Sequence, residues 1–176
     1  MMNWLRTNIY ASGLALILRL YIGFQWMTHG FDKIKGGAFD ASGYLKNIVA
    51  NPVKGPDGAT VYPLYNSFIE HFALPNAGLF NVLVPWGEFL IGLGLILGVL
   101  TTAAAFFGLL MNFMFFFGGT VSTNPSFILI GFIILVAGAN AGRLGGDYWV
   151  LPWIRKTIFH KDDTPSVKTD KLAPSH

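Results

Sequence analysis

The stretch RLYIGFQWMTHGFDK, residues 19–33, starts inside a long apolar segment and ends in charged residues. Successive residues of a helix are about 100° apart around its axis. If this stretch is helical, five of its residues share one side of the helix, within roughly 40° of Arg19. They are Arg19, Gly23, Trp26, Gly30 and Lys33. A charged side chain at the centre of a bilayer costs at least ~2.5–3.5 kcal/mol, so Arg19 needs a partner or water. The stretch therefore predicts a membrane helix that carries these five residues on one stripe, and His29 lies at the edge of that stripe.

The composition of the whole chain supports a membrane protein. Of its 176 residues, 53% are hydrophobic and only 12% are charged, whereas soluble domains average about 25% charged residues. The length suits one bundle of a few spanning helices. There is no cysteine, which excludes disulfides and thiolate metal sites in this chain. The net charge of +3 comes without a basic, aromatic-rich run, so no nucleic acid is expected as a partner.

Four segments are apolar enough to cross a membrane at about 20 residues per span. They lie at residues 9–31, 80–100, 101–119 and 125–141. The predicted fold is therefore an all-α membrane protein, a four-transmembrane-helix bundle with a long outer loop at residues 32–79 between its first two helices. We expect this membrane domain to cover residues 1–156 and a disordered polar tail to follow at 157–176. The Lys and Arg residues near the span ends favour a multi-pass protein of the cell membrane with both termini in the cytoplasm.

The outer loop is too long to be a simple connection. Its segment VYPLYNSFIEHF, residues 61–72, has apolar residues at helical spacing and predicts a short helix on the outer face of the bundle. Two interpretations stay open, a packed surface segment and a lid over an outward-facing pocket. At the start of the third span, Thr101 or Thr102 is the expected N-cap.

Glu88 is the expected partner of Arg19. Each lies about ten residues into its span, and the two spans run in opposite directions, which predicts an ion pair near the middle of the membrane. Asn112, near the middle of the third span, is expected to join them. One interpretation is that this network fixes helix packing and has no other role. However, a buried ion pair often stabilises no more than apolar residues of similar size would, so its presence favours a functional role.

The histidines do not predict a metal or haem site. No two of them have a spacing of three or four residues, and no cluster of carboxylates accompanies them. We therefore predict no bound metal and no haem.

Three motifs carry a resemblance to a known family. The first is R-x3-G-x2-W-x3-G-x2-K from Arg19 to Lys33, the second is W-x-E-x3-G beginning at Trp86, and the third is GANAGRLGGDYW at residues 138–149. In their order and spacing over four spans, they resemble the DoxX/DoxD family of bacterial and archaeal membrane proteins. That resemblance implies a plasma-membrane protein linked to oxidoreductase systems. DoxD-like members are the membrane subunit of thiosulfate:quinone oxidoreductase, which oxidises thiosulfate to tetrathionate, reduces quinone and works with a small DoxA-like partner.

The expected site is an outward-opening pocket that takes a quinone, as substrate or bound electron acceptor. Its expected catalytic residues are Arg19, which stabilises developing negative charge, and Glu88 and His29, which handle protons. The expected quinone-binding residues are Trp26, Lys33, Trp86 and Asn112. Thiosulfate is expected nearer the outer side, at Lys33, Lys35 and His29.

Two other functions stay open at this point. One is a non-enzymatic membrane scaffold for a soluble redox partner, and the other is a small-solute carrier, for which no inverted repeat is evident. The lipid bilayer is an expected partner in every case. The sequence also leaves open a homo-oligomer, the electron donor, and whether the chain acts alone.

Overall fold

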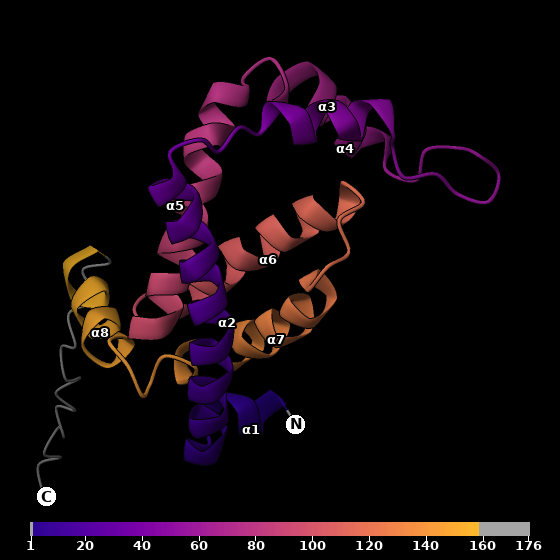
Figure 1. Ribbon diagram of the computed structural model, residues 1–176. Helices are drawn as coiled ribbons and strands as arrows, with labels where there is room; N and C mark the ends of the chain where they lie inside the picture. Colours follow the sequence, from indigo (N-terminus) through magenta and orange to yellow (C-terminus); the bar gives the residue numbers. More distant parts are fainter. Residues whose placement is uncertain (1, 159–176) are drawn as a thin grey trace, which may run out of the picture.

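The computed structural model describes residues 2–158, and its regular elements are helices (Figure 1). A short helix α1 (Met2–Thr7) leads into the long helix α2 (Ile9–Gly36). The side chain of Asn8 caps α2 by accepting a hydrogen bond from the backbone N–H of Tyr10 at 2.8 Å. Gly37 ends the helix in the left-handed region, with φ of 62°. The helix thus continues five residues past its expected end at residue 31, and Lys33 belongs to it.

The loop between the first two long helices forms an outer cap over the far end of α2. It contains α3 (Ser42–Ala50), α4 (Pro63–Phe68) and the π-helical turn η1 (Ile69–Ala73). The helix expected within residues 61–72 is thus present as α4 and η1, whereas α3 was not expected. These elements share a small apolar core made of Ala41, Leu45, Ile48, Ile69 and Ala73.

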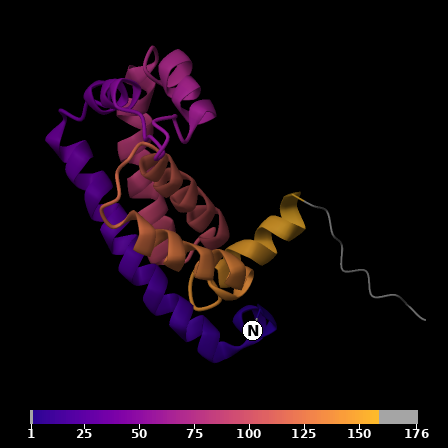
Figure 2. The same ribbon diagram turned by 90° about the vertical axis from the view of Figure 1, so that its right-hand side faces the viewer.

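The remaining long helices follow in quick succession. They are α5 (Ala77–Leu97), α6 (Thr101–Phe117) and α7 (Asn124–Ala137), with the 3-10 turn η2 (Gly138–Asn140) and α8 (Asp147–Ile158) after them. Figure 1 shows α5 alongside α2, with α6 and α7 crossing them obliquely. In Figure 2, α2 runs along one side of the molecule. The polar tail expected from residue 157 lies outside the described residues, apart from the last two residues of α8.

Two of these helices, α2 and α5, are long and apolar enough to cross a membrane, and α6 and α7 are shorter apolar helices. Large apolar side chains lie on their outer faces, with exposed fractions of 66% for Ile17, 59% for Val82 and 65% for Leu129. Surfaces of this kind are typical of helices that contact lipid.

Glycines set the register between α2 and α5. A Cβ atom at Gly30 would lie 2.7 Å from the carbonyl oxygen of Pro85, and one at Gly92 would lie 2.6 Å from the carbonyl oxygen of Gly23. Neither position has room for a side chain, so the two backbones approach closely, as small residues allow in membrane helices. This contact fixes which residues of the two helices lie opposite each other.

The end of the molecule opposite the outer cap is made by α1, η2 and α8 (Figure 1). Asn140 holds it together, because its amide nitrogen donates to the carbonyl oxygens of Leu5 and Asn8 at 2.8 and 3.0 Å. Its side-chain oxygen accepts a 2.7 Å hydrogen bond from the buried hydroxyl of Ser12. The short first helix is therefore tied to the segment that follows α7.

Candidate functional site

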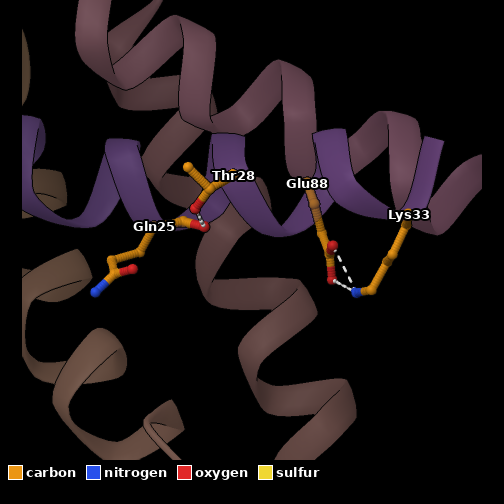
Figure 3. Close-up of polar contacts among 4 residues, drawn as sticks. All are labelled: Gln25, Thr28, Lys33 and Glu88. Atoms are coloured by element: carbon orange, nitrogen blue, oxygen red, sulfur yellow. Dashed lines mark hydrogen bonds and ion pairs between the residues drawn. The ribbon is translucent and has the colours of Figure 1, made fainter. Parts of the chain in front are cut away.

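Glu88 pairs with Lys33 and not with Arg19, so the predicted Arg19–Glu88 pair is wrong. The Nζ atom of Lys33 lies 2.5 and 2.6 Å from the two carboxylate oxygens of Glu88. Figure 3 shows the two side chains pointing toward each other between α2 and α5. The Lys33 side chain is 31% exposed and that of Glu88 only 3%. The carboxylate is therefore withdrawn from solvent and depends on this one cation for its charge balance.

The error comes from counting residues from the expected helix ends. That count takes the two helices as matched in length, but α2 reaches Gly36 and α5 already begins at Ala77. The glycine contacts set a different register, in which Glu88 lies near the outer end of α2. Lys33 is 14 residues beyond Arg19 in the chain, a helical rise of about 21 Å. Arg19 and Glu88 therefore lie at different depths.

Arg19 lies instead at the C-terminal end of α5, beside Gly98, and is buried with an exposed fraction of 1%. Its Nη2 atom donates a 2.7 Å hydrogen bond to the carbonyl oxygen of Leu144. The guanidinium fills the space beside two glycines, because a Cβ atom at Gly145 would lie 2.6 Å from its Nη1 atom, and one at Gly98 would lie 2.6 Å from its Cζ atom. Within the described residues, its Nε and Nη1 atoms have no hydrogen-bond partner.

Asp147 supports the turn beside Arg19. One carboxylate oxygen accepts a 2.7 Å hydrogen bond from the backbone N–H of Leu100, and the other accepts one of 3.0 Å from that of Thr101. Its own N–H donates to the carbonyl oxygen of Gly98 at 2.7 Å. The start of α6 is thus capped by a residue 46 positions away. The expectation that Thr101 or Thr102 would cap this helix is wrong, because Leu100 occupies the N-cap position and its side chain offers no acceptor.

A large apolar groove runs between α5 and α6 and under the outer cap. Its volume is about 1090 Å³, and nearly all of its lining atoms are apolar. The Lys33–Glu88 pair lies at its edge: the Nζ atom of Lys33 is 5.3 Å from the ring centre of Phe39 and 6.0 Å from that of Phe115. Both rings line the groove. A cation held over aromatic rings therefore adjoins this apolar space.

Two tyrosines of the outer cap close the groove against the end of α6. The hydroxyl of Tyr65 donates to the carbonyl oxygen of Met114 at 2.7 Å, and that of Tyr44 donates to the carbonyl oxygen of Phe115 at 3.3 Å. These carbonyls belong to the last turn of the helix and also accept hydrogen bonds from the backbone N–H groups of Gly118 and Thr120. Burial raises the pKa of both hydroxyls above the usual 10.0. Sequence reasoning missed this role because it counted Tyr65 only as an apolar position of a helix and did not consider Tyr44.

The other predicted site residues are spread over the bundle. His29 lies one turn before Lys33 on α2. Trp26 is 4% exposed and packs against Phe127 in the core, far from being a free surface for stacking. None of the expected quinone-binding side chains lines the groove wall itself.

Trp86 and Asn112 have contrasting surroundings. Trp86 is 49% exposed and packs edge-to-face on Phe89 of its own helix, which places it on the outer surface. Asn112 is 1% exposed, and its Oδ1 atom has no partner among the described residues. Figure 3 also shows Gln25 and Thr28, where the threonine hydroxyl donates to the carbonyl oxygen of Gln25 at 3.0 Å. That hydroxyl is bonded within its own helix. Of the four residues drawn in Figure 3, Lys33 and Glu88 are thus the two whose side chains join α2 to α5.

Comparison with known proteins identifies the family of this chain. The model of the DoxX family matches residues 14–123, from the first long helix through α6 to the start of α7. No curated protein and no solved structure matches the chain. The matched region contains Arg19, Lys33 and Glu88 and covers more than half of the sequence. The chain belongs to the DoxX family.

Proposed function

We propose that this protein is an integral membrane subunit of a quinone-linked oxidoreductase and that its quinone substrate binds in the groove between α5 and α6. The observation that carries the proposal is the Lys33–Glu88 pair at the edge of a large apolar groove. Small-molecule sites are mostly apolar cavities with a few placed polar groups. A quinone combines an apolar ring and tail with two polar oxygens, and the groove with its edge cation matches that combination.

The proposed chemistry uses the two charged side chains for different tasks. The Nζ atom of Lys33 donates a hydrogen bond to one quinone oxygen and stabilises the negative charge that develops there. Glu88 is ionised in the resting ion pair, so it first takes up a proton from His29 and then passes that proton to the quinone as electrons arrive. Quinone takes up two electrons and two protons to become quinol. Arg19 and Trp86 have no part in this chemistry, because both lie away from the groove.

The proposed electron donor is thiosulfate, on the basis of the resemblance to DoxD-like proteins. Two thiosulfate ions lose one electron each and join through a new S–S bond to form tetrathionate, which balances the two electrons that quinone accepts. Because Lys33 is neutralised by Glu88, the donor site belongs on the outer side with Lys35, which is exposed, and with a small DoxA-like partner.

In this proposal α2, α5, α6 and α7 all lie in the cell membrane. The outer cap is outside the cell, and α1 and α8 are at the cytoplasmic face. The support is the count of basic residues, which favours the cytoplasmic side in membrane proteins. Arg6, Arg143, Arg155 and Lys156 belong to the end formed by α1, η2 and α8, and three more lysines follow α8 in the sequence, whereas four lysines belong to the other end.

The test is direct binding of a short-tail quinone analogue to the purified protein, followed by tryptophan fluorescence, and thiosulfate-dependent reduction of that analogue with a DoxA-like partner added. The variant is Lys33→Met, and the matched control is Lys54→Met, an exposed lysine of the outer cap that does not line the groove. We expect the first variant to weaken binding or reduction at least about tenfold, as loss of a charge-assisted hydrogen bond predicts, and the control to resemble the wild type. Equal binding and equal reduction by both variants would overturn the proposal.

A second candidate function is a scaffold that holds a soluble redox enzyme through the outer cap. It is favoured by apolar side chains on that cap, where Leu64 is 87% exposed and Phe72 is 49% exposed. Phe72 does not line the groove, so Phe72→Ser tests the cap separately. If Phe72→Ser abolishes partner assembly while Lys33→Met changes neither assembly nor reduction, the scaffold replaces the enzyme.

A further inference from the structure

Three arginines from three separate segments line one pocket at the end of the molecule opposite the outer cap. Arg6 lies in the last turn of α1, Arg143 in the turn between η2 and α8, and Arg155 near the end of α8. The pocket has a volume of about 310 Å³. Since more than 130 residues separate the first two arginines in the chain, their convergence is a product of the fold.

The floor of this pocket is fixed by the buried network around Asn140. Its amide nitrogen donates two hydrogen bonds to α1 and its connection, and its oxygen accepts from Ser12. Asn140 is 6% exposed and also lines the pocket. These bonds tie η2 to α1 through Leu5, to the α1–α2 connection through Asn8 and to α2 through Ser12. The segments that carry Arg6 and Arg143 are therefore fixed relative to each other before any ligand arrives.

The pocket has an excess of positive charge that the protein does not neutralise. Its lining contains one acid, Asp147, which is 3% exposed and accepts backbone hydrogen bonds with both oxygens. Arg6 uses its Nε atom on the carbonyl oxygen of Val136 at 3.1 Å, and Arg143 uses one Nη atom on that of Thr7 at 3.4 Å. Within the described part of the chain, Arg155 donates no hydrogen bond to the protein. Most of the guanidinium N–H groups are thus left for a ligand.

We propose that this pocket binds a phosphate group. The planar guanidinium matches two phosphate oxygens at once, and three such groups around one pocket suit a tetrahedral anion. The adjoining helix α8 points to the source of that phosphate. Its residues Tyr148, Trp149 and Trp153 are 64%, 71% and 64% exposed, and such aromatic residues occupy the level of the lipid head groups.

A phosphate at that level belongs to an anionic phospholipid, and basic pockets beside membrane helices bind such head groups. The pocket would then hold one lipid where α1 meets α8. This assignment does not depend on the quinone proposal, because the pocket shares no lining residue with the groove.

The test uses the full-length protein in a neutral detergent. Binding is measured by native mass spectrometry in two arms, one with added phosphatidylglycerol and one with inorganic phosphate. The main variant is Arg155→Gln, which removes no bond within the described protein, and the matched control is Lys156→Gln, the exposed neighbour outside the pocket. The triple variant Arg6→Gln/Arg143→Gln/Arg155→Gln removes the whole cluster.

We expect Arg155→Gln to weaken phosphatidylglycerol binding about fivefold and the triple variant about a hundredfold, at about 1 kcal/mol per basic residue near the membrane surface. Lys156→Gln should bind as the wild type does. Arginine-dependent binding of inorganic phosphate alone would keep the phosphate site but assign it to a free anion. If Arg155→Gln binds both ligands as tightly as the wild type and Lys156→Gln do, the proposal is overturned, whether or not the triple variant folds.

Discussion

Lys33 and Glu88 form an ion pair whose two members are buried to very different degrees. The nitrogen of Lys33 lies 2.5 Å from one carboxylate oxygen of Glu88, yet the lysine side chain is 31% exposed and the glutamate side chain 3%. A charge that can reach water costs little when its partner is lost, whereas a fully buried charge has no such alternative. The two single substitutions of this pair should therefore have unequal effects.

We expect Lys33→Met to destabilise the protein by about 3 kcal/mol, because it leaves the buried carboxylate of Glu88 without a cation. Glu88→Gln should cost clearly less, since the freed lysine can turn to solvent. The double variant Lys33→Met/Glu88→Met should recover most of the loss. Thermal unfolding in detergent measures all three. An equal loss for both single variants would show that the exposure difference has no energetic effect.

The close approach of α2 and α5 gives a second prediction. Gly30→Ala should destabilise the protein by about 1–3 kcal/mol, because the added methyl group meets backbone atoms of Pro85 and Phe89 that cannot move aside. Gly13→Ala is the matched control in the same helix, since its Cβ atom would meet nothing within 4 Å. The control should leave stability unchanged or raise it by about 0.5–1 kcal/mol. Equal melting temperatures for the two variants would contradict the proposed helix contact.

Arg19 and Lys33 show which features of the site can be predicted from the sequence and which cannot. Helical periodicity correctly groups both residues with Gly23, Trp26 and Gly30 on one stripe, because the period is a local property. Arg19 and the three nonpolar members of the stripe are buried, with α5 packed along the same helix. Which residue of α5 lies opposite each of them depends on the close contact of two backbones. Residue counts from expected helix ends do not contain that information, so they chose the wrong cation for Glu88.

The capping of α6 and the closing of the groove were beyond sequence reasoning for a related reason. Asp147 caps a helix that begins 46 residues earlier in the chain, so the local pattern that favours Thr101 as a cap is overridden by tertiary structure. Tyr65 contacts Met114, 49 residues away. Contacts between residues this far apart in the chain cannot be read from local sequence patterns, because they depend on how the helices pack.

Asp147 gives a third prediction. Asp147→Ala should cost about 1–2 kcal/mol, since it removes the acceptors of two backbone N–H groups at the start of α6. Asp147→Asn keeps one acceptor oxygen and should lose about half as much. Thermal unfolding and amide hydrogen exchange of Leu100 and Thr101 measure the effect. Unchanged exchange at these two amides in Asp147→Ala would show that the aspartate does not cap the helix in solution.

The tyrosines of the outer cap give a prediction about pH. Burial raises the pKa of Tyr65 and of Tyr44 above the usual 10.0, so the folded protein keeps protons that the unfolded chain releases. The stabilisation that results is complete below pH 10 and is lost as the pH rises above 10. Stability measured between pH 8 and pH 11 should therefore fall steeply only in the upper part of this range.

The double variant Tyr44→Phe/Tyr65→Phe should be less stable at pH 8, by about 1 kcal/mol for each lost hydrogen bond, and its stability should fall less above pH 10. Tyr10→Phe, at a position 79% exposed, is the control and should follow the wild-type curve. If the double variant keeps the full wild-type slope above pH 10, the two hydroxyls do not hold the cap against α6.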